Sequence, residues 1–233
     1  MAKLISNEAI VPDVHVMKVE GSFEGRMGQF YMLRGRHGFP LLARPISIYD
    51  IAKEHISFLY RVVGEGTRIF ARMQPGEELD LEGPFGNGFP QVDGSLALIG
   101  GGMGTAPLLL AAKRYPDAHV YLGFAEQAFG VEAFEAASLS VAVQIGGSII
   151  ERVDPAHYAN MFACGPAPML GALARKTANT PARLYISVEQ HMACGIGACL
   201  GCTIHTAAGS RRVCKEGPVF PIGEVGLHEF FGM

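Results

Sequence analysis

Four cysteines near the C-terminal end of the chain are the residues whose spacing indicates chemistry most directly. Cys194, Cys199, Cys202 and Cys214 are separated by gaps of four, two and eleven residues. Thiolates are soft ligands that suit iron-sulfur clusters, zinc and copper(I). A C-x4-C-x2-C run followed at a distance by a fourth Cys is the plant-type ferredoxin spacing. The spacing therefore predicts that these four residues bind a 2Fe-2S cluster.

Other interpretations of the same cysteines remain open. Structural zinc usually takes ligands in two close pairs separated by a longer loop, and the four thiols could also be reduced and free of metal. A Rieske centre would need two His in place of two Cys on one iron, whereas His191 and His205 flank a set that already holds four Cys. The intervening glycines favour the cluster, since positive φ angles would let the loop curl around an inorganic core with its amides toward the sulfurs. These glycines are Gly195, Gly197 and Gly201.

The composition indicates packed cores and argues against a nucleic-acid partner. The chain has 233 residues, of which 49% are hydrophobic and 18% charged, enough for two modest domains or one large one. The net charge is -3, and no long basic run is present. A surface without a basic patch is not one that attracts nucleic acid.

Neither a signal peptide nor a membrane span is expected. The first twenty residues, MAKLISNEAIVPDVHVMKVE, lack an uninterrupted apolar core and alternate as a strand does. We therefore expect a cytoplasmic protein, in which cysteines stay reduced and available to metal. The stretch from Gly94 to Ala112 is uncharged, but its centre, GGGMGTAP, would break a spanning helix. It is predicted to form a buried strand, a loop and the start of a helix.

Short alternating runs in the first third of the chain predict antiparallel strands. From Ile10 to about Glu82 the runs VHVMKV, GQFYMLR and ISFLYRVV are separated by turn signals such as MQPGEEL. Alternation over such short distances is typical of an antiparallel barrel or sandwich.

Two segments within this region could contact a ligand. The segment ARPISIYD sets Arg44, Pro45 and Ser47 between an apolar run and a strand. In YRVVGEGTRIF, a turn at Gly64–Thr67 is predicted to interrupt a strand. Backbone amides and a hydroxyl in such a turn could hold a phosphate. Taken alone, both segments are equally compatible with a Pro-initiated strand and a Gly hairpin turn.

The pattern of apolar residues changes after EGPFGNGF, which spans 82–89 and is interpreted as a domain boundary. Beyond it the apolar runs SLALIG, HVYLGF, SVAVQI, MFACG and RLYISV alternate with segments such as APLLLAAKRY and PAPMLGALARK. Continuous apolar strands separated by helices predict a parallel sheet covered on both faces. The first of these strands ends in GGGMGTAPLL, a Gly-rich turn that opens a helix and so favours a pyrophosphate.

Two further residues stand where a nucleotide-binding sheet would use them. Glu126 follows the second apolar run, where a carboxylate can accept from a ribose hydroxyl and repel a 2'-phosphate, which favours NAD over NADP. A solvated loop Glu is the competing interpretation. Cys164 stands at the end of the fourth run, and ligands lie at such strand ends, although a buried Cys is otherwise a small apolar filler.

Together these motifs resemble the ferredoxin-NADP reductase superfamily and, within it, the family of electron-transfer subunits of type B dihydroorotate dehydrogenase. The resemblance covers nearly the whole chain, through RPISI, YRVVGEGT, GPFGNGF, GGGMGTAPL, ACGPAPML, MACGIGACLGC and VCKEGPVF. The last two motifs are the specific ones. The others are shared by the wider superfamily.

The resemblance implies an α/β plus β fold in three parts. These are an N-terminal antiparallel β-barrel for FAD at residues 1–90, a Rossmann-like parallel sheet for NAD at 91–188, and a small 2Fe-2S domain at 189–233. It also implies that FAD contacts Arg44, Pro45, Ile46, Ser47, Arg61, Val62, Val63, Gly66 and Thr67. NAD would contact Gly101, Gly102, Gly104, Thr105, Cys164, Gly165 and Pro166, in addition to Glu126. The chain departs from the superfamily at Ile46, where an aromatic residue is common, so stacking on the flavin from that side is expected to be weak.

The function implied by the resemblance is electron transfer within a complex. Electrons would run from dihydroorotate through the FMN of a catalytic subunit, the 2Fe-2S cluster and FAD to NAD+, in pyrimidine synthesis, within a heterotetramer of two chains of each kind. The alternative is the same role in another complex, of the hydrogenase or sulfur reductase type. No acid-base pair is needed, so no catalytic residue is predicted. Arg211, Arg212 and Lys215 surround Cys214 and form either a solvated face or a basic group that acts on the cluster or an acidic partner.

Overall fold

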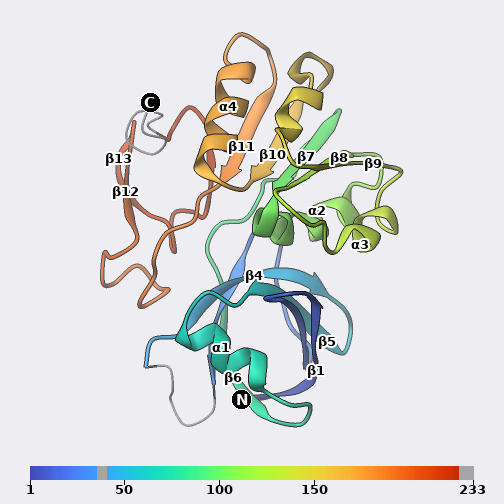
Figure 1. The fold of residues 1–233 in the computed structure, drawn as a ribbon. Coiled ribbons are helices and arrows are strands. Elements are labelled where there is room, and N and C mark those ends of the chain that lie inside the picture. Colours follow the sequence, from blue (N-terminus) through green and yellow to red (C-terminus); the bar gives the residue numbers. More distant parts are fainter. Residues whose placement is uncertain (36–40, 226–233) are drawn as a thin grey trace.

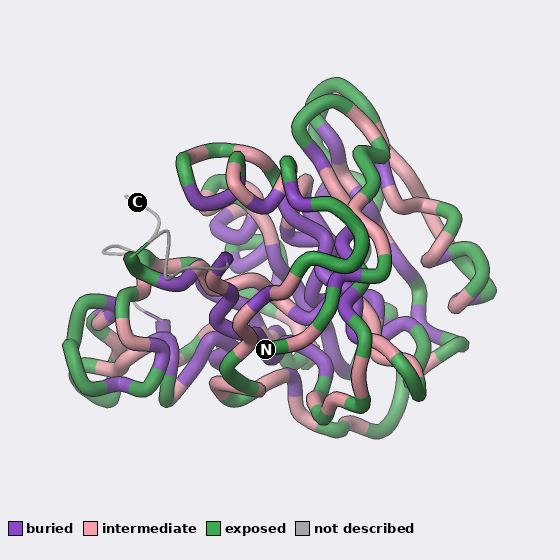
Figure 2. Tube along the Cα trace, turned by 90° about the horizontal axis from the view of Figure 1, so that it is seen from below, coloured by how far each residue is buried: buried purple, intermediate pink, exposed green. Residues whose placement is uncertain are grey.

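The chain folds into a barrel, a sheet with helices on both faces, and a C-terminal segment beside them (Figure 1). The computed structural model describes residues 1–35 and 41–225. Buried residues gather inside each part, and exposed residues lie at the outer bends (Figure 2). The three-part architecture expected from the sequence is confirmed.

Six antiparallel strands close the barrel in the order β1-β2-β5-β4-β3-β6. In β2 the side chains of Met17 and Val19 are buried in the barrel core, as the alternating sequence predicts, whereas Val14 is buried in the cluster shared with the sheet. The strands are β1 (Ala2–Val11), β2 (Val14–Glu20), β3 (Phe30–Gly35), β4 (Arg44–Ile51), β5 (His55–Arg61) and β6 (Glu78–Phe85). Because β6 runs to Phe85, the boundary motif EGPFGNGF begins inside a strand and is a turn only in its second half.

The segment expected to be a turn at Gly64–Thr67 is instead the start of a helix, α1 (Glu65–Arg72), and this prediction was wrong. The Thr67 hydroxyl accepts from the amides of Val63 at 3.0 Å and Gly64 at 3.2 Å and donates to the Gly64 carbonyl at 3.1 Å. These bonds satisfy groups that a helix N-terminus otherwise leaves unpaired. Phe70 is fully buried in the barrel core, so α1 covers one end of the barrel.

The sheet has the order β14-β11-β10-β7-β8-β9. Its central strands β7 and β10 are buried along their whole length, as expected for strands covered on both faces. The parallel strands are β7 (Leu96–Gly101), β8 (His119–Phe124), β9 (Ser140–Ile145), β10 (Asn160–Cys164) and β11 (Arg183–Ser187). All five were predicted as apolar runs.

Helices pack on the two faces of this sheet in separate groups. One face carries the 3-10 helix η2 (Gly102–Leu108), α2 (Leu109–Arg114) and α3 (Val131–Glu135). The other carries η3 (Ile149–Arg152) and α4 (Ala167–Thr177), with the short η4 (Pro155–His157) leading into β10. The uncharged stretch from Gly94 to Ala112 is therefore strand and helix, as predicted. None of the helices in the described residues is long and apolar enough to span a bilayer.

The C-terminal segment leaves the sheet after β11 and returns to it. It forms the hairpin β12 (Thr203–Thr206) and β13 (Gly209–Arg212), and its strand β14 (Val219–Pro221) pairs antiparallel with β11. The predicted division of the chain near 90 and 188 stays a prediction. What the structure adds is that β14, although distant in sequence, completes the sheet that carries the Gly-rich turn.

The barrel and the sheet pack directly on one another. The barrel residues Tyr49 and Leu59 share one buried cluster with Leu109 of α2 and Phe124 of β8. An ion pair between Asp50 of β4 and Lys113 of α2, at 2.6 Å, spans the same junction. Burial of apolar surface and this ion pair fix the two parts together and create the junction at which the candidate cavities lie.

Candidate functional site

A cavity of about 360 Å³ lies between the barrel and the carboxyl ends of the sheet strands. The barrel contributes the starts of β4 and α1 and the end of β5, and the sheet contributes the end of β10 and the residues after β11. Strand carboxyl ends are where ligands lie in such sheets. Of the residues predicted to contact FAD, the following line the cavity: Arg44, Pro45, Ile46, Ser47, Arg61, Val63 and Thr67. Val62 and Gly66 do not line it.

Gly66 nevertheless positions Arg44. A methyl group at Gly66 would place its carbon 2.6 Å from Arg44 Nε, so the guanidinium lies directly on the first turn of α1. Arg44 Nη1 also donates to the Leu42 carbonyl at 2.6 Å. A fixed guanidinium beside free helix amides is an arrangement that suits a phosphate. The Thr67 hydroxyl is occupied in capping α1, so Thr67 acts by holding this turn rather than by offering its oxygen.

A second cavity, of about 270 Å³, lies at the carboxyl ends of β7 and β10. Five residues predicted to contact NAD line it: Gly101, Gly102, Gly104, Gly165 and Pro166. Thr105 is buried and donates to the Gly102 carbonyl at 2.9 Å, which holds the Gly-rich turn from below. Glu126 is exposed after β8 and lines neither cavity, so its contact with a ribose stays a prediction without support from these cavities.

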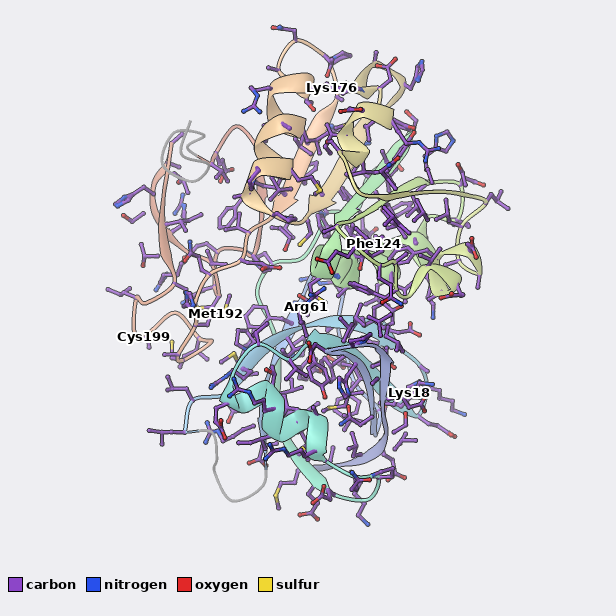
Figure 3. The ribbon with its side chains drawn as sticks, in the orientation of Figure 1. Lys18, Arg61, Phe124, Lys176, Met192 and Cys199 are labelled. Atoms are coloured by element: carbon purple, nitrogen blue, oxygen red, sulfur yellow. The ribbon has the colours of Figure 1, made fainter. Side chains whose placement is uncertain are left out.

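The two cavities adjoin. Arg61, Met103 and Glu189 line both of them, and Figure 3 shows Arg61 where the barrel meets the sheet. The Arg61 guanidinium lies 5.9 Å from the centroid of the Phe129 ring, a contact that holds it across the junction. A molecule in one cavity would therefore face a molecule in the other.

Cys164 lines the first cavity, not the second, and stands close to the junction. Burial and the nearby Glu189 carboxylate raise the pKa of the Cys164 thiol, while a hydrogen bond with Ser187 opposes this rise. The pKa of Glu189 is itself raised by the surrounding protein, although its side chain is open to the cavities. Cys164 is therefore a neutral thiol at the junction, where it packs and does not bring a charge.

Sequence reasoning missed several lining residues, chiefly Phe30, Ser187, Glu189, Gln190 and Met192. Ser187 to Met192 directly follow a strand that had been predicted, so the rule that ligands lie at strand carboxyl ends would have found them. Phe30 carried no such signal. It reaches the cavity only because β3 is next to β4 in the barrel.

The four C-terminal cysteines form two pairs. The Cys199 amide donates to Cys194 Sγ at 3.5 Å, and the Cys214 amide donates to Cys202 Sγ at 3.4 Å. In residues 1–35 and 41–225, no three His, Cys, Asp or Glu side chains converge tightly enough to bind a single metal ion. Two irons, each held by two thiolates, need a pair of sulfurs for each iron. The paired arrangement fits a 2Fe-2S cluster better than a tetrahedral zinc site.

The conformation of the cysteine loop matches the expectation except at one residue. Gly195 and Gly197 have φ values of +71° and +80°, as predicted, but Gly201 does not have a positive φ. Leu200 takes the left-handed turn instead, with φ of +61°. The loop bends one residue earlier than its glycines suggest, and the side chain of Leu200 is consequently exposed.

The thiols differ in acidity because their surroundings differ. The amide of Cys199, followed by the amides of Ile196 and Ala198, lowers the pKa of Cys194 to about 6. Burial and the neighbouring Cys202 raise the pKa of Cys214 to about 12. Amides directed at sulfur stabilise a thiolate, and they also stabilise the added negative charge of a reduced cluster.

In the chain stripped of its cluster, we expect iodoacetamide to modify Cys194 long before Cys214 at pH 7. The thiolate is the nucleophile, so the rate at Cys194 should rise as the pH passes about 6, whereas Cys214 stays a thiol. Timed alkylation followed by peptide mass spectrometry measures both rates. Faster modification of Cys214 would contradict the difference in acidity.

Comparisons with known proteins agree with this arrangement. A family model described as the iron-sulfur cluster binding domain of dihydroorotate dehydrogenase B matches residues 189–226. The dihydroorotate dehydrogenase B (NAD(+)), electron transfer subunit of Clostridium acetobutylicum is 39% identical, and the match covers 97% of each chain. The chain belongs to this family of electron transfer subunits. The family member from Caldanaerobacter subterraneus subsp. tengcongensis is 38% identical over 96% of this chain and 97% of its own.

Solved structures share the fold of this electron transfer subunit at lower identity. A chain in the structure of an NADH-dependent reduced ferredoxin-NADP oxidoreductase has a TM-score of 0.89 and 22% identity, and the match covers 100% of this chain and 92% of that one. A ferredoxin reductase of carbazole 1,9a-dioxygenase has a TM-score of 0.61 and 20% identity, over 76% of this chain and 63% of its own. The first likeness includes the C-terminal segment as well as the barrel and the sheet.

Proposed function

We propose that the chain is the electron-transfer subunit of an NAD+-dependent dihydroorotate dehydrogenase and passes electrons from an FMN-containing catalytic subunit through a 2Fe-2S cluster and FAD to NAD+ in pyrimidine synthesis. The observation that carries the proposal is the order of the three sites. The nucleotide cavity adjoins the flavin cavity through Arg61 and Glu189. The flavin cavity in turn reaches Met192, two residues before Cys194. Figure 3 shows Met192 in the C-terminal segment, on the side of the barrel.

Each group would be held by residues of suitable chemistry. Arg44 and the first turn of α1 bind the FAD phosphates, Ser47 and Pro45 line the flavin, and the Gly-rich turn after β7 admits the NAD pyrophosphate. The two cysteine pairs hold the cluster. When bound, nicotinamide exchanges a hydride, the cluster exchanges single electrons, and the flavin does both. Met32 packs against Gly195, where a methyl carbon would lie 2.7 Å from Met32 Cγ, so barrel and cysteine loop are held in contact.

The catalytic subunit docks over the cysteine loop in this proposal. Cys199 is exposed, and beside it the apolar side chains of Ile196 and Leu200 are 57% and 61% exposed. Figure 3 shows Cys199 at the outer end of the C-terminal segment. Apolar side chains at the edge of a redox site are suited to burial by a partner. Assembly as two chains of each kind, within the cytoplasm, is part of the same proposal.

Replacement of Leu200 by Asp should weaken the complex by roughly tenfold or more, the loss typical of an interface anchor. Asp tolerates the left-handed conformation at this position better than most residues, so the loop itself is preserved. Leu139→Asp is the matched control, because Leu139 is 86% exposed and directly precedes β9, at the opposite edge of the sheet from β14. Titration calorimetry with the catalytic subunit measures both. Equal affinities for the two variants would place the interface elsewhere.

The flavin assignment predicts that Gly66→Ala lowers the affinity for FAD. The added methyl carbon would lie 2.6 Å from Arg44 Nε and displaces the guanidinium from the first turn of α1. Loss of a hydrogen bond to a charged group costs about 1.5–3 kcal/mol, roughly a tenfold to hundredfold rise in Kd. Fluorescence titration of the flavin-free chain measures this change.

Gly64→Ala is the control for this experiment, since nothing lies within 4 Å of a side chain there and its φ of -154° is ordinary. Gly64 is two residues away in the same segment. A similar loss of affinity in both variants would mean that Arg44 is not the residue that holds FAD.

The overall proposal is tested by purifying the chain without oxygen and measuring its visible spectrum, iron content and released flavin. We expect FAD and two iron atoms per chain, as a 2Fe-2S cluster contains, and NAD+-linked dihydroorotate oxidation once the catalytic subunit is added. A colourless zinc protein would overturn the proposal. A coloured protein that is inactive with that subunit would instead indicate a role in another complex, of the hydrogenase or sulfur reductase type.

A further inference from the structure

Arg212 connects the two separate stretches of chain that carry the cysteines. It ends β13, two residues before Cys214, and its Nη1 donates to the Gly197 carbonyl at 3.0 Å. Gly197 lies between Cys194 and Cys199, in the other stretch. One side chain thus spans from the segment of the fourth cysteine to the loop of the first two.

Glu216 completes the connection from the other side of Cys214. Its Oε2 accepts from Arg212 Nε at 3.0 Å and from the Arg212 backbone amide at 2.7 Å, and its Oε1 accepts from Arg212 Nη2. The guanidinium and the carboxylate therefore form a two-pronged pair with a third bond to the backbone. Such a pair has a fixed geometry that isolated surface ion pairs lack.

The backbone of the cysteine loop is shaped to receive this pair. A methyl group at Gly197 would place its carbon 2.9 Å from Lys215 Cδ and 3.4 Å from Arg212 Cδ. The stems of both basic side chains thus lie against the bare backbone, and only a glycine with φ of +80° leaves them room. Arg212 therefore packs closely against the backbone of Gly197 in addition to donating a hydrogen bond to it.

Both members of the pair carry charge beside the cysteines. The side chains of Arg212 and Glu216 are 32% and 26% exposed, so water screens them only in part. Arg212 donates to both carboxylate oxygens of Glu216, which is the paired hydrogen bonding of a guanidinium with an ionised carboxylate. Arg212 stands two residues before Cys214, whose amide donates to Cys202 Sγ at 3.4 Å, and Arg212 Nη1 donates to Gly197 in the loop of Cys194 and Cys199. A positive and a negative charge therefore stand side by side next to one half of the cysteine set.

We propose that Arg212 and Glu216 act as a compensated charge pair that sets the reduction potential of the cluster, with Arg212 raising it and Glu216 offsetting that rise. This inference rests on the cluster of the proposed function. A reduced cluster carries one more negative charge than an oxidised one, so a nearby cation favours reduction and a nearby anion opposes it. Arg212 and Glu216 are positioning residues in this role, because they act on the cysteine loop and do not ligate the metal.

The pairing predicts shifts of opposite sign. Arg212→Gln leaves the Glu216 carboxylate without its partner, so the midpoint potential should fall. Glu216→Gln leaves the guanidinium without its partner, so the potential should rise. The double variant Arg212→Gln/Glu216→Gln removes both charges and should lie between the single variants, close to the unaltered chain. A merely structural role would move both single variants in the same direction.

The experiment is a redox titration of the full-length, cluster-loaded chain, followed by electron paramagnetic resonance at low ionic strength. Lys215→Gln is the matched control, because it removes one adjacent positive charge that makes no such forked contact, and its shift should be smaller than that of Arg212→Gln. Arg212→Lys keeps the positive charge but loses the paired hydrogen bonds from the guanidinium to Glu216. If Arg212→Gln fails to retain iron, Glu216→Gln and Lys215→Gln can still be compared. A rise in the midpoint potential of Glu216→Gln supports the charge pair, and the absence of a rise contradicts it.

Two results separate this inference from the function on which it rests. An unaltered chain without iron would overturn the proposed function itself. An unaltered chain with a full cluster, alongside variants that keep its potential or shift it in one common direction, would overturn only the role of the charge pair.

Discussion

Replacing Cys199 with Ser is expected to abolish NAD+-linked oxidation of dihydroorotate by the assembled complex, while the chain keeps its flavin. Cys199 is the exposed member of the pair that it forms with Cys194. A hydroxyl is a harder donor than a thiolate and gives up its proton far less readily, so Ser is a much poorer ligand for this cluster than Cys. Changes to residues that merely support metal ligands already cost about 10–100-fold in metal affinity or activity, and loss of a ligand should cost more. Iron content, the visible spectrum and the steady-state rate measure the effect.

Cys164→Ser is the control for cluster binding, because Cys164 lies at the cavity junction and not in the C-terminal segment. That variant should retain two iron atoms per chain, whatever it does to the flavin. Because Cys199 is exposed, Cys199→Ser should not unfold the chain. Retention of dihydroorotate oxidation by a Cys199→Ser chain that has lost its iron would show that electrons do not pass through this cluster.

Patterns local in sequence account for most of what could be predicted. Each apolar run of the sheet became a strand because a strand buried on both faces must be apolar throughout, as β7 and β10 are. The cysteine spacing predicts a ligand set because three of the four residues lie in one short loop, and this assignment stays a prediction. The start of β4 lines the cavity proposed for FAD for the same reason, since Arg44 to Ser47 are consecutive residues at one end of a barrel strand.

The features that were missed depend on contacts between residues distant in sequence. Gly64 and Gly66 predict a hairpin turn where helix α1 begins. The helix forms instead because it buries Phe70 in the barrel core. Strand β14 has three residues, and only pairing with β11 makes it a strand. The sequence shows Arg212 only as part of a basic group with Arg211 and Lys215, since the Gly197 carbonyl to which it donates lies fifteen residues away.

The assignment of the nucleotide cavity predicts a second large effect, from Gly104→Ala. The new methyl carbon would lie 2.3 Å from the carbonyl oxygen of Cys164 and 2.5 Å from the amide nitrogen of Gly165. Both atoms belong to the backbone at the end of β10, which cannot rotate away as a side chain does. Overpacking of this kind costs about 1–3 kcal/mol of unfolding free energy.

The same displacement should also impair NAD binding, because Gly104 and Gly165 both line the nucleotide cavity. We expect a raised KM for NADH in reduction of an artificial acceptor, with FAD content retained, and a lower urea midpoint. Gly223→Ala is the control, since a side chain there would meet nothing within 4 Å and its φ is not in the left-handed region. If Gly104→Ala lowers stability but leaves the KM unchanged, the cavity between β7 and β10 is not where NADH binds. If it changes neither, the close approach of the Gly-rich turn to β10 does not determine the site, and the nucleotide must reach the flavin by another face.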